Sequence, residues 1–359
     1  MTIDSHRLRR LQRIGLALTT TILLALSGID RGEARREVWT EEQKTKLQQA
    51  ERVHVETVAL AADGAADRTA LQRAVATRLS ALGYTIVEDP SQPHELTLKV
   101  KCEERKTWEG PLRSGGDADQ PDAAARLWKG PACQFGYRLE QQWSDWRHEV
   151  RTKDATDKGR AAMEHLLNRL QDDPFPFLLA AEWGQPARLL KVLSIPQTAV
   201  PQQTTIVTLL GEMSAVEAIP ALGQAAKSPE PPVAQAALVA LGNIGHEDGI
   251  PILLAALGAP QQPTRLAAIK GLGRLAALHP TSDIVPALLA QLPQENIPGQ
   301  IEIVRALGRT TDRRILPPLK ALNRSVQDRT RSDSAAELKE LRVALGQALD
   351  QFDGTHTEE

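Results

Sequence analysis

Three groups of residues in this sequence have side chains capable of chemistry: an acidic cluster, a cysteine pair and a set of tryptophans. His246, Glu247 and Asp248 are consecutive and could form a metal or acid–base site. Acidic residues in a short turn before a helix more often cap that helix, and capping is the interpretation we favour. The chain has no glycine-rich phosphate loop, no His-Glu-x-x-His pattern and no Gly-x-Ser-x-Gly pattern. We therefore expect no catalytic residue, no metal and no cofactor.

Cys102 and Cys133 are the two cysteines of the chain. They lack the short spacing and the additional ligands that a zinc site needs. An even pair in an exported protein indicates one disulfide, while two buried free thiols are the alternative. We expect the disulfide, and closing a loop of about thirty residues would stabilise the fold by roughly 3–4 kcal/mol.

Trp128, Trp143 and Trp146 lie close together in the sequence. Aromatic rings of this kind could form a platform on which a ligand stacks. Large aromatic side chains more often fill a core or pack at its rim, and this is the interpretation we favour.

The composition excludes several classes of protein. The 359 residues are 42% hydrophobic and 25% charged, which is ordinary globular material. Aromatic residues make up only 3%, so a core of Ala, Leu, Val and Ile in packed helices is favoured over an aromatic-rich β-sandwich. The net charge of −2 excludes a strongly basic protein that coats nucleic acid.

The first residues have the pattern of a Sec-type signal peptide. Positive charges at Arg7, Arg9, Arg10 and Arg13 precede an apolar stretch over 14–29, and the small residues Gly32 and Ala34 follow. The stretch is shorter than the ~20 residues of a comfortable membrane span. We expect cleavage after Ala34, with an uncleaved anchor as the alternative. The mature chain would be a soluble periplasmic or secreted protein without stable membrane insertion.

A small α/β domain is predicted over 53–172, after a linker helix over 35–52 that begins with a capping box at Thr40. We expect the order β-α-β-β-β-α, with a loop over 108–131. The strands are predicted at 53–58, 84–88 and 95–100, with a strand or hairpin over 134–151, and the helices at 67–82 and 157–170.

The phrase Leu-Gly-Tyr-Thr-Ile-Val-Glu-Asp-Pro at 82–90, within this order of elements, resembles the small α/β modules of bacterial envelope-assembly proteins. The resemblance covers about 100 residues of the chain. It implies a binding or assembly module rather than an active site.

Two short phrases recur in fixed order over the rest of the chain. Leu-Gly pairs stand at 210, 241, 272, 307 and 345, and a phrase with Pro-x-Leu at its end follows the first four, at 219, 250, 285 and 316. Successive Leu-Gly pairs are 31, 31, 35 and 38 residues apart. Two phrases that recur in fixed order at such a spacing are the signature of a solenoid built from stacked helix pairs. The mainly α fold class follows, with the solenoid at 173–352 and a disordered tail at 353–359.

Each unit is interpreted as two helices joined by a short turn. The glycine suits either close packing of helices or a helix end, and the proline falls in the first turn of the second helix, where its missing N–H costs little. The predicted caps of the second helices are Glu217, Asp248, Asp283 and Asp312. The longer spacings imply insertions near Pro293–Gly299 and Arg324–Ser334.

The units are similar to HEAT repeats, in particular to the short class first associated with phycobilisome lyases. Residues 236–251 are the best unit, and the resemblance covers roughly 175–350. Residues 177–193 are interpreted as a degenerate opening repeat, and the helix that carries Leu338, Leu345 and Phe352 as the cap. Protein binding through a concave surface is what this resemblance implies.

Charge is unevenly distributed along the predicted solenoid. Residues 172–263 carry a net charge of −5, and residues 264–331 carry +6. A solvated outer face is one interpretation, and a docking surface for an acidic partner protein or an anionic envelope polymer is the other. The candidate binding residues are Arg274, Arg305, Arg309, Arg313, Arg314, Lys320 and Arg324.

These observations predict an exported, non-enzymatic scaffold or adaptor. An enzyme-associated subunit, by analogy with the lyases that attach bilin pigments, is the alternative. Export argues against it, because that chemistry belongs with cytosolic pigment assembly. A binder of peptidoglycan or lipopolysaccharide is a third possibility, and we expect no nucleic acid partner.

Overall fold

The computed structural model describes residues 39–61, 68–108, 128–152, 159–279, 283–332 and 336–353. The predicted signal peptide over 1–34 and the tail beyond Asp353 lie outside these residues. The chain divides into a unit of residues 1–43 and a compact unit of residues 44–359. Thr40 and Gln43 form the reciprocal hydrogen bonds of the predicted capping box, where helix α2 (Glu41–Gln49) begins.

A small mixed sheet follows α2. Its strands are β1 (Arg52–Leu60), β2 (Thr85–Val87), β3 (Leu96–Trp108), β4 (Trp128–Leu139), β5 (Gln142–Trp143) and β6 (His148–Arg151). The strand order is β2-β1-β3-β4-β5, and β6 also pairs with β4. Strand β1 is parallel to β2 and β3, whereas β4 is antiparallel to β3, β5 and β6. The predicted α/β module before the solenoid is therefore confirmed.

One boundary of this module was predicted wrongly. The expected loop over 108–131 is shorter, because β3 continues through Trp108 and β4 already begins at Trp128. Strands β3 and β4 stay paired beyond a bulge between Glu103 and Lys106. Their ladder therefore extends past Leu60, the last residue of β1, which pairs with Glu103.

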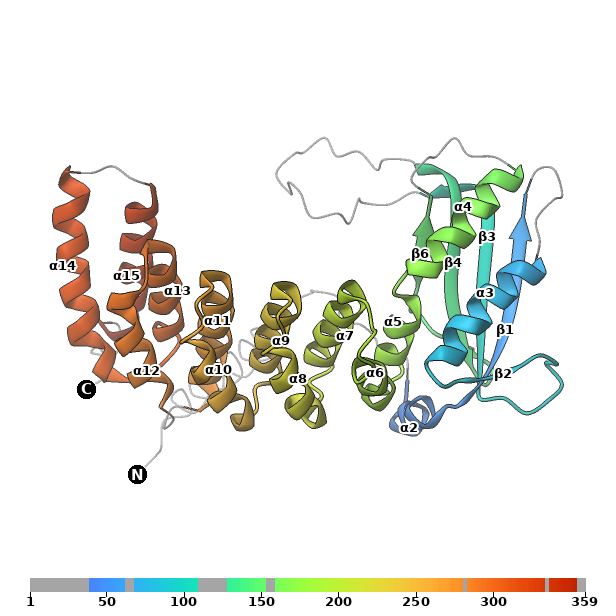
Figure 1. The fold of residues 1–359 in the computed structure, drawn as a ribbon, viewed down its shortest axis with the longest axis horizontal. Helices are drawn as coiled ribbons and strands as arrows, with labels where there is room; N and C mark the ends of the chain where they lie inside the picture. Colours follow the sequence, from blue (N-terminus) through green and yellow to red (C-terminus); the bar gives the residue numbers. More distant parts are fainter. Residues whose placement is uncertain are drawn as a thin grey trace, which may run out of the picture. The chain divides into compact units, whose positions relative to one another are not determined.

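The sheet has one buried face. Helices α3 (Arg68–Ala81) and α4 (Gly159–Asp172) contact each other and the strands, and Figure 1 shows both on the same side of the sheet. Leu98, Val100 and Cys102 alternate along β3 and are fully buried, while Lys99 and Lys101 between them are partly exposed. This period of two places the lysines on the face opposite to the helices.

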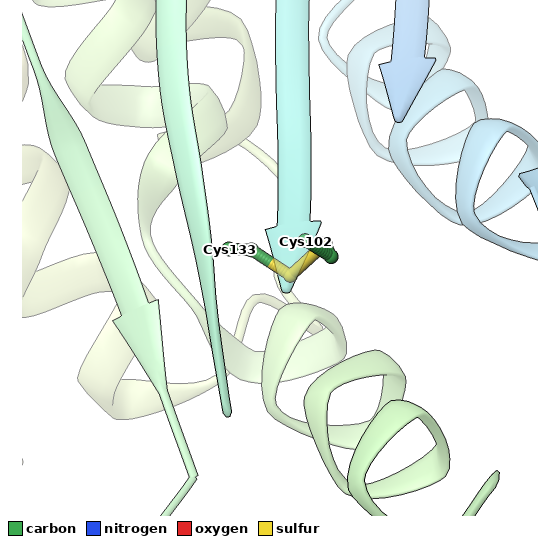
Figure 2. The surroundings of a disulfide bond; sticks show 2 residues. All are labelled: Cys102 and Cys133. Atoms are coloured by element: carbon green, nitrogen blue, oxygen red, sulfur yellow. A yellow bond between two sulfur atoms is a disulfide. The ribbon is translucent and has the colours of Figure 1, made fainter. Parts of the chain in front are cut away.

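A disulfide joins Cys102 to Cys133, as predicted (Figure 2). The two residues are direct partners in the antiparallel ladder of β3 and β4, and their Cα atoms are 3.9 Å apart. Both are fully buried beneath the helices. The register of the hairpin therefore brings together cysteines that are 31 residues apart in the sequence.

Pairs of helices fill the rest of the described chain. They are α5 (Phe175–Glu182), α6 (Pro186–Leu193), α7 (Val200–Glu212), α8 (Ile219–Ala225), α9 (Pro231–Ile244), α10 (Ile250–Ala256), α11 (Gln262–Leu278), α12 (Ile284–Gln291), α13 (Ile297–Leu307), α14 (Leu316–Ser332) and α15 (Ala336–Asp353). Helix α7 packs on α9, α9 on α11, α11 on α13 and α13 on α15, so one helix of each pair forms a continuous row (Figure 1). The predicted solenoid is confirmed.

Four of the five recurring glycines, Gly211, Gly242, Gly273 and Gly308, lie where neighbouring helices of this row touch. A Cβ atom added to Gly211 would lie 2.6 Å from the Cα of Ala240, and one added to Gly242 would lie 2.5 Å from the Cα of Gly271. Helix α9 ends later, at Gly245 with a φ of 73°. Close packing therefore explains Gly211 and Gly242, whereas Gly308 is the C-cap residue of α13 and Gly346 has no described atom near its Cβ position.

The contact at Gly242 predicts that Gly242→Ala lowers the free energy of unfolding by roughly 1–3 kcal/mol, because the added methyl group pushes two backbones apart. Gly346 in α15 is the matched control, since no described atom lies within 4 Å of the position its Cβ would take. Gly346→Ala is expected to add about 0.5–1 kcal/mol through helix propensity alone. Denaturant unfolding measures both, and equal effects would contradict the packing role.

The predicted helix caps are correct at one position of four. Asp312 accepts a hydrogen bond from the backbone N–H of Arg314, whereas Asp283 makes no side-chain cap bond. At the equivalent turn His246 is the cap, and it accepts from the N–H of Asp248. Glu217 lies inside its turn, two residues after Ala215. A short 3-10 turn precedes the second helix, so acids that looked equivalent occupy different positions of that turn.

The two predicted insertions take different forms. Residues near Pro293 form a single 3-10 turn before α13. The later one lengthens a helix, since α14 continues through Ser332. In the part of the chain that the structure describes, none of the helices has the length and apolar character that crossing a membrane requires.

The sheet and the first helix pair share a buried junction. Trp183, at the end of α5, is 1% exposed and meets the rings of Tyr84 and Tyr137 edge-on, with centroids 5.3 and 5.5 Å away. The guanidinium of Arg188 lies 4.0 Å from the centroid of the Tyr84 ring. Burial raises the pKa of Tyr84, so its hydroxyl remains a hydrogen-bond donor.

Gln185 completes this junction with four side-chain hydrogen bonds, one of them accepted from Nε of Arg188 at 2.8 Å. It accepts from the Tyr84 hydroxyl at 2.6 Å and donates to the carbonyl oxygens of Leu47 and Ala50 at 2.7 and 3.0 Å. The side chain is 5% exposed. Because buried polar groups are costly unless paired, this residue fixes the segment after α2 and the start of β2 against the first repeat.

Candidate functional site

The seven basic residues predicted to bind a partner lie on two successive helix pairs, α11–α12 and α13–α14. Arg274 is on α11, Arg305 on α13 and Arg309 just after α13, while Arg313 and Arg314 form the turn before α14 and Lys320 and Arg324 lie on α14. Arg313, Arg314, Lys320 and Arg324 therefore follow one another along the turn and helix of α14, whereas Arg274 lies on another helix pair.

Two of the seven are neutralised within the chain. Arg305 binds Glu302 at 3.2 Å and Glu340 at 2.8 Å, which ties α13 to α15. Arg314 binds Asp312 at 2.6 Å, and its hydrogen bonds hold the pKa of the Asp312 carboxyl below its ordinary value. These two side chains stabilise the solenoid rather than offer free charge.

Four others form what we call the basic segment: Arg309, Arg313, Lys320 and Arg324. All four are exposed, and none forms an ion pair with a described residue. Lys320 and Arg324 are one turn apart on α14, on the side away from the buried Leu319 and Val326. The basic segment thus consists of four exposed cations without an ion pair to a described residue, and Arg274 is a further exposed cation on α11.

The acidic first half of the solenoid is also exposed. Its carboxylates lie mainly in or beside the turns that join helices, at Glu212, Glu217, Glu230, Glu247 and Asp248. The charge asymmetry read from the sequence is therefore a property of the surface.

The other candidate groups take structural roles. His246 caps a turn, and the described residues contain no group of three or more His, Cys, Asp or Glu side chains that could hold a metal ion. Trp146 packs near the rings of Tyr137 and His148, with centroids 6.1 Å from each. Trp143 differs, because 40% of it is exposed on the open face of the sheet. The side chain of Trp128 lies outside the described residues.

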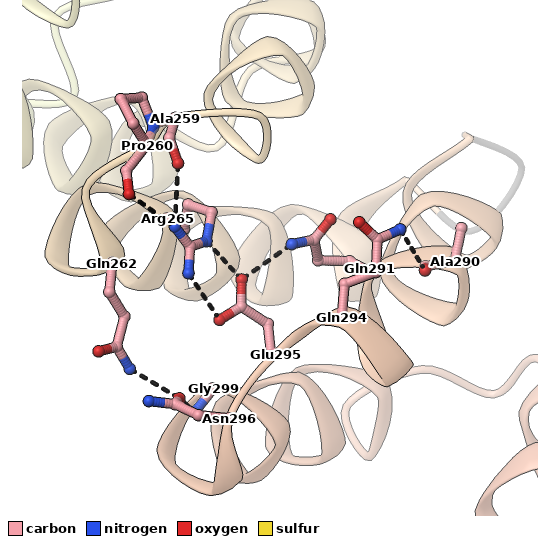
Figure 3. A network of polar contacts seen from close by, with 10 residues as sticks. All are labelled: Ala259, Pro260, Gln262, Arg265, Ala290, Gln291, Gln294, Glu295, Asn296 and Gly299. Carbon is pink, nitrogen blue, oxygen red and sulfur yellow. Dashed lines mark hydrogen bonds and ion pairs between the residues drawn. The ribbon is translucent and has the colours of Figure 1, made fainter.

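One polar cluster could not be identified from the sequence. Arg265 on α11 binds Glu295 through two contacts, at 2.5 and 3.1 Å, and the Glu295 side chain is fully buried (Figure 3). Gln291 donates a third hydrogen bond to that carboxylate at 2.8 Å. The hydrogen bond from Arg265 holds the pKa of Glu295 below its ordinary value despite burial. Glu295 lies in the predicted insertion before α13, and that insertion was the one feature of the sequence that pointed to this region.

The class of protein follows from the stacked pairs and a family comparison. Residues 187–273, from α6 into α11, match the family model described as HEAT repeats. The helix pairs of this part of the solenoid are therefore similar to HEAT repeats, and a small α/β module precedes the solenoid. A search of curated proteins found no match to the chain.

Proposed function

We propose that this protein is an exported, non-enzymatic scaffold whose HEAT repeats bind a partner protein, with the basic segment receiving an acidic stretch of that partner. HEAT repeats commonly mediate protein interactions, which supports the scaffold role. The observation that carries the acidic partner is the lack of ion pairs at Arg309, Arg313, Lys320 and Arg324.

Electrostatics favours an acidic ligand at this position. Residues 264–331 carry a net charge of +6, and the pairs that neutralise Arg305 and Arg314 leave the basic segment uncompensated. Like charges on adjacent helical turns repel, so a carboxylate-rich ligand relieves that repulsion and is attracted from a distance. Such charges raise the association rate and the specificity of a complex.

Export is supported by two independent features. The basic and then apolar start of the chain has the pattern of a signal peptide ending at Ala34. The disulfide between Cys102 and Cys133 is the second, because disulfides persist in oxidising compartments such as the periplasm.

Charge reversal of the basic segment tests the proposal. We expect Arg313→Glu, Lys320→Glu and Arg324→Glu together to weaken binding of a labelled polyglutamate peptide by at least roughly tenfold and to flatten its salt dependence. Fluorescence anisotropy on the full chain measures this. The control reverses three exposed cations elsewhere, Arg73, Lys191 and Lys227, with the same change in net charge.

Equal loss of affinity in the two triple variants would overturn the proposal, since overall charge would then explain binding. Purified lipopolysaccharide provides the second probe. If it binds the same three residues more tightly than the peptide does, the ligand is an anionic envelope polymer and the acidic protein partner is wrong.

A further inference from the structure

We infer that the open face of the sheet holds a second binding site, for a saccharide that carries an acidic group. This site is on the α/β module, and it involves neither the basic segment nor the proposed partner. It rests on a hollow in the sheet, an exposed tryptophan beside it and the mixture of charges at its edge.

The hollow arises at Gly136 in the middle of β4. Gly136 is the direct partner of Lys99, and Gln134 is the partner of Lys101, so these residues lie on the face opposite to α3 and α4. The missing side chain of Gly136 leaves room for Arg147, whose Nη1 lies 3.3 Å from the position that a Cβ would take, so this guanidinium lines the groove here. The groove has a volume of about 330 Å³, and its lining consists of Lys99, Lys101, Gln134, Phe135, Gly136, Trp143 and Arg147. Small-molecule sites of ~300–1,000 Å³ are usual, so this one suits a single ring system.

Trp143 provides a flat apolar wall. Its strand β5 pairs with β4 so that Trp143 is the partner of Arg138. The Arg138 guanidinium and the Lys99 ammonium lie 5.7 and 5.8 Å from the centroid of its ring, which holds the ring in place while 40% of the residue stays exposed. The C–H face of a sugar ring is apolar and packs on such a surface.

The polar groups select a ligand rich in hydroxyl groups. Lys99 binds Glu56 at 2.8 Å and Lys101 binds Glu103, so acceptors stand beside donors at the edge of the groove. The hydroxyl groups of a saccharide donate and accept hydrogen bonds and so use both kinds of group, whereas an ionised phosphate chain only accepts. Arg138 and Arg147 leave an excess of positive charge, which a carboxylate on the sugar would neutralise.

Calorimetry on the full chain tests this site with three probes: a trimer of galacturonic acid, maltotriose and a single-stranded oligothymidylate. We expect the acidic trimer to bind and the other two to bind at least roughly tenfold more weakly. Trp143→Ala is expected to weaken binding of the acidic trimer by about tenfold, because stacking on the ring is lost. Trp143 is exposed, so this change leaves the fold intact.

Matched lysine variants locate the site. Lys101→Gln should weaken binding of the acidic trimer, and Lys320→Gln on α14 should leave it unchanged. Tighter binding of oligothymidylate, equal binding of maltotriose, or a loss of affinity confined to Lys320→Gln would each overturn the inference. None of these outcomes bears on capture of the polyglutamate peptide, so the two proposals fail independently.

Discussion

Arg265→Met is expected to lower the free energy of unfolding by roughly 3–5 kcal/mol, because it leaves a fully buried carboxylate without its partner. Glu295 would keep the hydrogen bond from Gln291 but lose both contacts with the guanidinium. Denaturant unfolding of the full chain measures the change. The matched control is Arg305→Met, which removes a partly exposed ion-pair network and should cost less than about 1 kcal/mol.

A double substitution distinguishes the destabilisation caused by leaving Glu295 unpaired from the net contribution of the Arg265–Glu295 ion pair to the free energy of unfolding. Arg265→Met combined with Glu295→Met should recover most of the stability, since two apolar side chains often replace a buried ion pair at little cost. A double variant as unstable as Arg265→Met alone would contradict this account.

The Arg265–Glu295 ion pair makes the free energy of unfolding depend on pH, and the direction of that dependence follows from the pKa of Glu295. Glu295 has a lowered pKa in the folded protein, against an ordinary value of 4.5. The folded state therefore binds its proton less readily than the unfolded state does, and the contribution is complete above about pH 4.5. It is lost as the pH falls through the lowered folded pKa. The double variant should lose less stability than the parent protein between pH 6 and the acid range.

Removing the disulfide is the other change with a large expected effect. Cys102→Ala with Cys133→Ala should lower the free energy of unfolding by about 3–4 kcal/mol, because the unfolded chain regains the freedom of a loop of 31 residues. Thermal unfolding of the module's tryptophan signal, with and without reductant, measures this. Reductant should destabilise the parent protein and leave the double variant unchanged. A parent protein that is indifferent to reductant would show that the bond contributes nothing.

The sequence was informative where a backbone contact demands one residue type. Gly211 and Gly242 recur because a side chain there would collide with the next helix. The same steric requirement therefore returns in successive repeats. The prolines at 220 and 251 recur for a related reason, since each lies at the start of a helix where no N–H is needed. Such positions can be identified without knowing what lies beside them.

It was less informative where the partner of a side chain decides its role. Arg305 and Arg309 look alike in the sequence, but Glu340 neutralises only the first. Arg265 was not distinguished from its neighbours, because Glu295 meets it across a turn 30 residues away. The hollow at Gly136 depends on the register of β4 against β3, which alternation alone does not give. The disulfide between the two cysteines was also predicted from the oxidising compartment that export implies, and not from the positions of the cysteines in the fold.

The buried junction at Trp183 and Gln185 gives the array of repeats a fixed origin. Each internal pair meets the next through an equivalent glycine contact, so a pair can be duplicated or deleted there with its interfaces preserved. Inserting a helix pair next to α5 would instead break the hydrogen bonds that Gln185 forms with Tyr84, Leu47 and Ala50. Adding or deleting an internal pair would therefore change the spacing between the sheet groove and the basic segment and leave the junction at Trp183 intact.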